Sequence, residues 1–513
     1  MEIKMKKKIF ALSIAVMLAA ADTYAYKSAV GDIDNNRAVD AKDAAAVIRA
    51  VMNDKEIKPS YSFAVYDVNA DGKIDILDAA AILNGNISSA SYKTEVRDTE
   101  RAAKMDGFAE YIFTLEDGDP SNGSAWNTEN TTQFKWSYIN GCMASAYLRL
   151  YEAAGGTKYK NYADNYMSGF INADGSFKDK VSNRNNVTNP TKLALDDINS
   201  GKSMLELISL DSANSGAYRA FAADTLYGSV LAGFESLRTA EGNYYHKYGY
   251  PCQVWLDGTY MALPFKLRYE YDINNGANIA AVSDDVTNQF KNIYNKMRDK
   301  TTGLYYHGYC SGNDPESGDH GKVNFKWASY NTDNPGCSQC VWLRGQAWYA
   351  MALADCIELM EDGDDRDTLI FIYKDLMDSL IRYQDDNGMW RQVIDGEKSS
   401  ANYFETSGSA GIAYALMKGY NLNILPQEYY DAGLKAFNGV VDNKLAVTKN
   451  KGVTVYTLSD ICKVAGLDDI SRNGSYTYYT TRTEKVSNDA KGMAPLLLAY
   501  SEVLKHDTVY VEK

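Results

Sequence analysis

Apolar residues recur at intervals of three and four along most of the chain from residue 99 to residue 513, which is the spacing that one face of a helix requires. Clear examples begin at Asn140, Gly345, Ser407 and Ala490. Long alternating runs, which are typical of strands, are scarce. About 415 residues divided into units of one helix and its loop, each ~35 residues long, give roughly twelve helices, or six hairpins, a number consistent with an (α/α)6 barrel. The pattern therefore predicts an all-α fold for residues 99–513.

One segment, "YPCQVWLDGTYMALPF" at residues 250–265, is apolar and aromatic almost all the way round and predicts a buried helix. Asp257 lies in the middle of this segment, close to Trp255. An unpaired carboxylate is costly in such surroundings. The presence of Asp257 there therefore calls for a functional explanation.

The first residues of the chain have the pattern of a secretory signal peptide. A basic stretch at Lys4–Lys8 precedes an apolar run at Ile9–Ala21, and Thr23 and Ala25 stand at positions typical of cleavage. The alternative, a membrane anchor, is disfavoured because the run is short for a transmembrane helix and no later stretch qualifies. We expect residues 1–25 to be removed and the mature protein to be secreted, extracellular and free of the membrane.

Two acidic segments that start 35 residues apart, at Asp32 and Asp67, share the spacing of a twelve-residue calcium loop. Each has oxygen-bearing side chains at positions 1, 3, 5, 9 and 12 and a backbone carbonyl at position 7. The predicted ligands of two structural Ca²⁺ sites are Asp32, Asp34, Asn36, Ala38, Asp40 and Asp43 in the first loop, and Asp67, Asn69, Asp71, Lys73, Asp75 and Asp78 in the second. The alternative is a solvated acidic repeat on the surface, which the two complete loops with matching helices disfavour.

The duplicated unit of a loop and a helix behind a signal peptide resembles a type I dockerin over residues 30–88. The resemblance implies a small α-helical calcium-loop domain that docks onto a cohesin module of a scaffold protein, as in a cellulosome at the cell surface. Calcium would supply folding energy that so small a core lacks. Residues 89–98 then form a polar linker, and the larger domain covers residues 99–513.

Composition narrows the functional classes. The formal net charge of −14 argues against nucleic acid as a partner, since binding it requires a basic surface. The chain has seven cysteines, and Cys337 and Cys340 form one CxxC pair in a polar loop. No second pair of ligands stands at a suitable spacing for zinc. A buried thiol or a local disulfide is the better interpretation.

Two of the four histidines, His246 and His307, lie in tyrosine-rich segments between predicted helices, and His246 precedes Asp257 by eleven residues. Arg344 stands between Trp342 and Trp348 and shares a helical face with Trp348. A guanidinium between indoles suits a planar carboxylate held against a sugar ring. The alternative is an arginine that stacks on tryptophan at the surface.

A third group lies in "LALDDINSGKSMLEL", where Asp196 and Asn199 are three positions apart and share a helical face. This group is either part of a polar site or an N-capping cluster in front of the helix that contains Met204. The spacing alone is compatible with both.

The segments "HKYGYPCQVWLDGTYMALPF", "LDDINSGK", "WLRGQAW" and "ETSGSAGIAYAL" resemble the unsaturated rhamnogalacturonyl hydrolases of glycoside hydrolase family 105, to which the unsaturated glucuronyl hydrolases of family 88 are related. The resemblance spans nearly all of residues 125–505 and implies an (α/α)6 barrel. It makes Asp257 the general acid/base, with no cofactor for catalysis. The residues that it places in the substrate pocket are Tyr138, His246, Lys247, His307, Trp342, Arg344 and Trp348, and the second acidic position of the family falls near Asp196 to Asn199.

The resemblance implies hydration of the C4=C5 double bond of terminal unsaturated galacturonyl residues in rhamnogalacturonan or pectin oligosaccharides, with release of the adjacent sugar. Such chemistry requires a protonated Asp257, and its apolar neighbours predict a raised pKa. A long insertion after His307, residues 310–340, is expected to reshape the pocket. The alternatives are an unsaturated glucuronyl hydrolase, an ordinary inverting glycosidase on the same toroid, and a sugar-binding module without catalysis.

Overall fold

The computed structural model describes residues 41–52, 68, 75–84, 93–94, 99–115, 135–154, 156–211, 215–506 and 510–511. The chain divides into two compact units. The smaller comprises Met1–Asp106, Leu150–Tyr159 and Ser501–Lys513, and the larger comprises Gly107–Arg149 and Lys160–Tyr500. The predicted signal peptide lies outside the described residues. None of the described helices combines the length and the apolar character that crossing a membrane would need.

The smaller unit contains the helices that follow the two predicted calcium loops, α2 (Ala41–Met52) and α4 (Ile76–Asn84). Their contact is made by small and branched apolar side chains, which form a core of Ala44, Val47, Val68, Ala79, Ala81 and Ile82. A core of this size contributes little stability by itself. Strands β1 (Lys93–Thr94) and β8 (Tyr510–Val511) pair antiparallel in the same unit, so part of the predicted linker is a strand.

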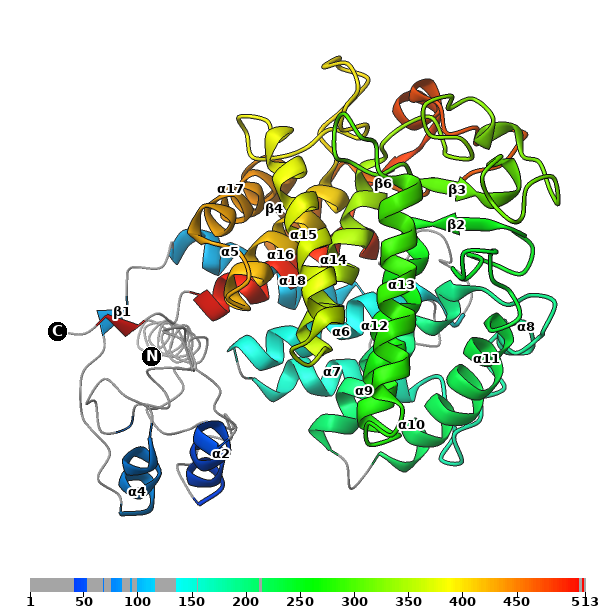
Figure 1. The fold of residues 1–513 in the computed structure, drawn as a ribbon. Helices are drawn as coiled ribbons and strands as arrows, with labels where there is room; N and C mark the ends of the chain where they lie inside the picture. Colours follow the sequence, from blue (N-terminus) through cyan, green and yellow to red (C-terminus); the bar gives the residue numbers. More distant parts are fainter. Residues whose placement is uncertain are drawn as a thin grey trace. The chain divides into compact units, whose positions relative to one another are not determined.

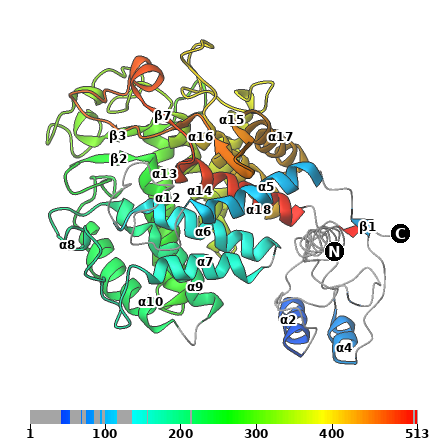
Figure 2. The same ribbon diagram turned by 180° about the vertical axis from the view of Figure 1, so that it is seen from behind.

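The larger unit consists of long helices in two layers, which confirms the all-α prediction (Figure 1; Figure 2). The inner layer is buried almost all the way round and contains α6 (Tyr138–Ala154), α9 (Ser200–Leu210), α12 (Leu256–Asp272), α14 (Leu343–Leu359), α16 (Thr406–Asn421) and α18 (Ala490–His506). The helices of the outer layer are α5 (Thr99–Thr114), α7 (Thr157–Ser168), α10 (Gly216–Ala220) with its continuations η4 (Phe221–Leu231) and α11 (Ala232–Phe234), α13 (Ile279–Met297), α15 (Asp364–Arg382) and α17 (Gln427–Lys444).

The helices of the two layers differ in sequence because the inner helices are buried on all sides and the outer helices along one face. Helix α14 reads "LRGQAWYAMALADCIEL" and is apolar round most of its circumference, because it is packed on all sides. Helix α13 buries one stripe, which includes Val282, Val286, Phe290 and Ile293, and leaves its other face polar. Small residues allow the inner helices to approach one another. A Cβ atom on Gly411 of α16 would lie 2.9 Å from the Cβ atom of Ala347 on α14.

Short strands and turns connect the helices of the larger unit. The strands are β2 (Gln253–Trp255) with β3 (Gly308–Cys310), β4 (Leu445–Asn450) with β5 (Val453–Leu458), and β6 (Ile461–Cys462) with β7 (Lys485–Val486), each pair antiparallel. The short helical turns are α8 (Arg184–Val187), η2 (Leu195–Ile198), η5 (Ser311–Asn313), η6 (Lys326–Ala328) and the π-helical η7 (Tyr478–Arg482).

The prediction of a single helix through residues 250–265 is wrong. Residues 253–255 form β2, in which Val254 pairs with Tyr309, and the helix α12 begins only at Leu256. Cys252 adopts a left-handed conformation with φ of 59°, which interrupts any helix before the strand. Asp257 therefore lies in the first turn of α12, where the positive end of the helix dipole favours a carboxylate.

The long insertion at residues 310–340 is ordered by buried polar and aromatic side chains. Asp319 is 1% exposed and accepts hydrogen bonds from the Ser311 hydroxyl at 2.7 Å and the Ala240 backbone N–H at 2.8 Å. Trp327 is fully buried in a cluster that includes Trp255 and Leu467. The insertion therefore packs behind Trp255.

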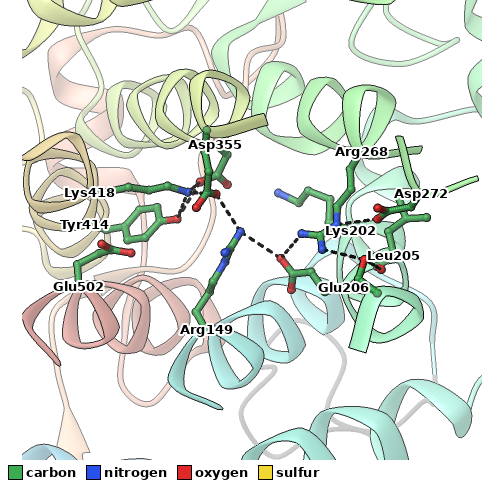
Figure 3. Close-up of polar contacts among 12 residues, drawn as sticks. Arg149, Lys202, Leu205, Glu206, Arg268, Asp272, Asp355, Tyr414, Lys418 and Glu502 are labelled. Carbon is green, nitrogen blue, oxygen red and sulfur yellow. Dashed lines mark hydrogen bonds and ion pairs between the residues drawn. The ribbon is translucent and has the colours of Figure 1, made fainter. Parts of the chain in front are cut away.

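The carboxyl-terminal ends of the inner helices carry a buried network of alternating charges, which we call the floor network (Figure 3). Its members are Arg149 of α6, Glu206 of α9, Arg268 of α12, Asp355 and Glu358 of α14, and Lys418 of α16. Arg149 lies 3.4 Å from Glu206 and 3.1 Å from Glu358. Lys418 lies 2.7 Å from both Asp355 and Glu358 and is 1% exposed. Paired charges therefore fill the barrel interior at this end.

Candidate active site

The residues predicted to form a site come from distant parts of the chain and gather at the amino-terminal ends of the inner helices, opposite the floor network. Tyr138 is the first residue of α6, Asn199 immediately precedes α9, and Asp257 and Arg344 are the second residues of α12 and α14. Unbonded N–H groups and the helix dipole make such ends favourable for anions.

Asp257 is paired with a histidine. Its Oδ2 atom lies 3.3 Å from Nε2 of His307, and Nδ1 of the same imidazole lies 2.7 Å from the hydroxyl of Tyr479. His307 is fully buried, while the side chain of Asp257 keeps 15% of its surface exposed. The carboxylate is therefore reachable from outside and is contacted from inside by one imidazole. Tyr479 lies in η7. It was not among the residues predicted from the sequence, because no spacing in the sequence links it to His307.

The expectation that apolar neighbours raise the pKa of Asp257 is wrong. Burial does oppose its ionisation, but the close contact and charge of His307, followed by the charge of His246, outweigh burial and hold the pKa of Asp257 below its usual value. Asp257 is therefore ionised in the free protein at neutral pH, and any proton that it delivers must be supplied during the reaction.

A second carboxylate, Asp196, lies beside the predicted basic residues. Its Oδ2 atom is 2.8 Å from Nζ of Lys247, and its Oδ1 atom is 3.7 Å from Nε2 of His246. Burial opposes ionisation of Asp196, but the charge of Lys247 outweighs it and lowers its pKa. Burial and the adjacent charge of Asp196 raise the pKa of Asp197 to about 7. Of the two neighbouring acids, Asp196 is the one in contact with His246 and Lys247.

Aromatic rings form one wall of the site. The rings of Tyr250, Trp255 and His246 stack in succession, with centroids 5.2 Å and 4.7 Å apart. Trp255 meets His307 edge-on at 5.3 Å. Burial is the main reason why the pKa of His246 falls to about 4, so its imidazole is neutral near pH 7. The stack is therefore a rigid, largely apolar face beside the Asp257 carboxylate.

Arg344 carries a buried charge beside this wall. Its guanidinium lies 4.8 Å from the Trp342 ring, which is in turn 4.5 Å from the ring of His307. Arg344 is 3% exposed and donates hydrogen bonds to the Ser407 hydroxyl at 3.2 Å and to the Cys462 carbonyl. Among the described residues, no carboxylate pairs with it within 4 Å. The alternative of a surface arginine stacked on tryptophan is therefore wrong.

The remaining predicted residues support the site from behind. Trp348 is buried and stacks on Tyr260 at 4.9 Å, one turn further along the inner helices. Asn199 donates hydrogen bonds to the Tyr138 carbonyl at 2.8 Å and to Sγ of Cys142 at 3.4 Å. Although Asn199 occupies the N-cap position of α9, its side chain makes no capping bond, so the N-capping interpretation is wrong for it.

The cysteines are free thiols. All seven are unbonded to one another, and Sγ of Cys337 donates to the Lys296 carbonyl at 3.2 Å. The buried-thiol interpretation is therefore confirmed for Cys337, Cys340 is a half-buried free thiol, and the local disulfide is wrong. Within the described part of the chain, no three His, Cys, Asp or Glu side chains are grouped to hold a metal ion.

The predicted calcium loops are described only at their ends. Asp78 is fully buried and accepts hydrogen bonds from the Val68 N–H at 2.7 Å and the Asp75 N–H at 2.8 Å. Asp43 is also fully buried. Buried acidic side chains at these positions fit a cation site. The predicted ligands Asp32, Asp34, Asn36, Ala38, Asp40, Asp67, Asn69, Asp71 and Lys73 lie outside the described residues.

Comparison with known families decides the class of the protein. The model of Glycosyl Hydrolase Family 88 matches residues 119–507, which is more than half of the chain. The chain belongs to glycosyl hydrolase family 88. The enzyme class predicted from the sequence, a glycoside hydrolase, is thereby confirmed. The dockerin type I domain model matches residues 30–85, which confirms the predicted dockerin.

This family 88 chain is also similar to individual proteins and solved structures. Protein Atu3128 of Agrobacterium fabrum is 32% identical over 250 residues, covering 48% of this chain and 98% of that protein. The unsaturated rhamnogalacturonyl hydrolase YesR of Bacillus subtilis is 30% identical over 180 residues, covering 33% of this chain and 42% of YesR. A solved glycoside hydrolase from family 105 of C. acetobutylicum is similar with a TM-score of 0.62 at 30% identity, covering 78% of this chain and 98% of that one. The predicted (α/α)6 architecture and the relationship to family 105 are confirmed.

Proposed function

We propose that the protein hydrates the C4=C5 double bond of terminal unsaturated galacturonyl residues in rhamnogalacturonan-derived oligosaccharides, with Asp257 as the general acid/base. The observation that carries the proposal is the buried cation of Arg344, which forms no ion pair within 4 Å with a described carboxylate and is linked to Glu405 through the Ser407 hydroxyl, next to a single aspartate–imidazole pair. Burying an unpaired charge is unfavourable unless a ligand completes the pair. The site thus combines a receptor for an anionic sugar with one group that exchanges protons.

The carboxylate of the unsaturated sugar is the natural partner of Arg344. A guanidinium presents two parallel N–H bonds to a planar carboxylate, and the amino-terminal ends of α12 and α14 add favourable dipoles. The rings of Trp342 and Trp255 offer apolar faces against which a sugar can lie. An acid held in this way brings its C4=C5 bond towards Asp257.

The reaction needs one proton at C4 and one water molecule at C5. A proton from Asp257 forms the C4–H bond, and the electron pair of the double bond is consumed, leaving an oxocarbenium centre at C5. Water bonds to C5 and returns a proton to Asp257. The resulting hemiketal opens, and the hemiacetal left at C1 releases the neighbouring sugar. One residue therefore serves as acid and then as base, and no second catalytic carboxylate is required.

The lowered pKa of Asp257 in the free protein fits this cycle once the substrate is bound. A substrate carboxylate beside Arg344 brings a second negative charge near Asp257, and a like charge raises the pKa of a carboxyl group. His307, 3.3 Å away, is positioned to share the proton with Asp257. Binding of the substrate would thus favour protonation of Asp257, which the reaction uses as its acid.

The test uses unsaturated disaccharides produced by lyases, and it follows both the ultraviolet absorbance of the conjugated double bond and the release of sugar. The proposal expects absorbance to disappear with rhamnogalacturonan-derived substrates. Activity confined to glucuronyl substrates would instead favour the alternative of an unsaturated glucuronyl hydrolase. An ordinary inverting glycosidase would release sugar while absorbance persists, and a binding module would do neither. The similarity to the unsaturated rhamnogalacturonyl hydrolase YesR supports the galacturonyl choice.

The dockerin supports an extracellular role on a scaffold. We propose that residues 30–88 bind two calcium ions and dock onto a cohesin module of a scaffold protein outside the cell. In support, α4 leaves large apolar side chains in solvent, with Ile76 and Leu77 each 56% exposed and Leu83 62% exposed. Adjacent exposed apolar residues on a small domain favour a protein partner. The proposal is tested by measuring cohesin binding with and without calcium.

A further inference from the structure

Tyr479 meets His307 on the side away from Asp257. Although 172 residues separate Tyr479 from His307, its hydroxyl lies 2.7 Å from Nδ1. The side chain is fully buried, and its ring lies nearly parallel to Trp342, with an angle of 13° and centroids 6.0 Å apart. Within the described residues, His307 is the only hydrogen-bond partner of this hydroxyl. Both nitrogens of the catalytic imidazole thus have a defined neighbour.

Burial raises the pKa of Tyr479 well above its usual value, so its hydroxyl keeps its proton at neutral pH. A neutral hydroxyl can donate one hydrogen bond and also accept one. It can therefore donate to Nδ1 of a neutral imidazole, which leaves the proton of that imidazole on Nε2. When His307 and Asp257 together hold one more proton, Nδ1 carries a hydrogen, and the same hydroxyl accepts it.

We propose that Tyr479 is a positioning residue that fixes the tautomer of His307, so that in the free enzyme Nε2, which lies 3.3 Å from Oδ2 of Asp257, carries the hydrogen. This inference rests on the proposed role of Asp257. Without the tyrosine hydroxyl, the neutral imidazole can place its hydrogen on Nδ1, and the lone pair of Nε2 then faces the ionised carboxylate. In that arrangement the Nε2 lone pair repels the Asp257 carboxylate, and no hydrogen lies between the two residues. The hydrogen-bond partner of one imidazole nitrogen commonly decides the state of the other.

The neighbouring residue supplies a matched control. Tyr478 belongs to the same buried cluster as Trp342 and Tyr479, but its hydroxyl accepts a hydrogen bond from the Gly466 N–H at 3.0 Å and does not contact His307. Tyr478→Phe and Tyr479→Phe each remove one buried hydroxyl from the cluster. A purely structural role for these hydroxyls would give the two variants similar effects.

The experiment measures kcat, KM and the pH profile of kcat/KM for both variants on the unsaturated disaccharide. For Tyr479→Phe we expect kcat to fall roughly 10-fold to 100-fold, the scale for loss of an orienting partner, with little change in KM. We also expect the acidic limb of the pH profile to shift. Tyr478→Phe should keep the wild-type kcat and pH profile. Wild-type behaviour of Tyr479→Phe, or equal losses in both variants, would overturn the proposal.

A second measurement does not depend on turnover. The chain has four histidines, so ¹⁵N NMR of histidine-labelled protein gives a small set of imidazole signals, and His307→Gln identifies those of His307. We expect His307 to be the Nε2–H tautomer in the wild type and to lose that preference in Tyr479→Phe. A wild-type Nδ1–H tautomer at neutral pH would sink the inference even if Tyr479→Phe failed to fold. If the wild type consumed no unsaturated sugar but showed the expected tautomer, only the proposed function would be lost.

Discussion

Oδ2 of Asp257 lies 3.3 Å from Nε2 of His307, and this contact reverses the effect that burial alone would have on the carboxyl group. The two residues come from different connections at the same end of the barrel, one at the start of α12 and one just before β3. In the proposed mechanism the two residues act as one unit, and the acid role of Asp257 depends on what the substrate and His307 do to its pKa.

Replacing the carboxyl group tests this unit directly. Asp257→Asn keeps the shape of the side chain but can neither deliver a proton nor take one from water. We expect turnover to fall roughly 100-fold or more, which is the scale of general acid–base catalysis, while the protein stays folded and still binds substrate. Absorbance loss and substrate binding are measured on the same preparation. Full activity in a destabilised variant would show that Asp257 is structural.

Arg344→Lys keeps the buried charge but loses the planar guanidinium, which can donate two parallel hydrogen bonds to one carboxylate. We expect KM to rise with a loss of about 1–3 kcal/mol in binding, the range for a hydrogen bond to a charged group, and kcat to change less. The control is Arg298→Lys, which removes the two-bond contact with Asp375 on the outer helices. The control should leave KM unchanged. A collapsed kcat with a normal KM in Arg344→Lys would contradict binding of the substrate carboxylate.

His246 makes stability depend on pH with a defined sign. Its folded pKa of about 4 lies below the unfolded value near 6.5, so between these values the unfolded chain binds the extra proton. This contribution is fully present above pH 6.5 and is lost as the pH falls towards 4. We expect acidification across this window to lower the free energy of unfolding of the wild type by on the order of 3 kcal/mol more than that of His246→Gln.

The measurement is urea unfolding at a series of pH values. Because other groups titrate in the same window, the comparison is between variants, and His320→Gln, which alters an exposed histidine, is the control. Parallel pH curves for the wild type and His246→Gln would show that His246 is not neutral when buried.

The floor network should matter for stability and not for chemistry. Lys418→Met leaves Asp355 and Glu358 without their 2.7 Å partner in the interior, and breaking a buried pair in this way costs about 3–5 kcal/mol. We expect a clearly lower melting temperature with normal turnover per folded molecule. The control Lys463→Met removes an ion pair whose partner Glu484 is mostly exposed, and it should cost about 0–1 kcal/mol. Equal melting temperatures for the two variants would contradict the argument.

Calcium removal should separate docking from catalysis. A chelator is expected to abolish cohesin binding because the small core of α2 and α4 cannot hold the dockerin fold alone, while hydrolysis continues. Leu77→Asp should also weaken docking without unfolding, since Leu77 is 56% exposed. Calorimetric titration with a cohesin module, alongside an activity assay, checks both. Cohesin binding that survives the chelator would contradict the predicted calcium sites.

The sequence by itself determined the class of fold, the dockerin and most of the residues at the site. Apolar spacing specifies helices because a buried helical face needs apolar side chains at intervals of three and four residues. The calcium ligands of one loop are likewise close together in the sequence. Asp257 was conspicuous as a carboxylate in apolar surroundings, and Arg344 as a cation between two indoles. These signals are local in the sequence, so they can be recognised without the tertiary structure.

Only the tertiary structure decided where α12 begins, what faces Asp257 and which way its pKa moves. The start of α12 at Leu256 depends on pairing of β2 with β3, more than fifty residues away. The pKa of Asp257 depends on His307 and His246, and the proposed state of His307 on Tyr479, 172 residues further along. Electrostatic and hydrogen-bond effects act through space over a few ångströms, and folding of the barrel alone brings these groups within that distance.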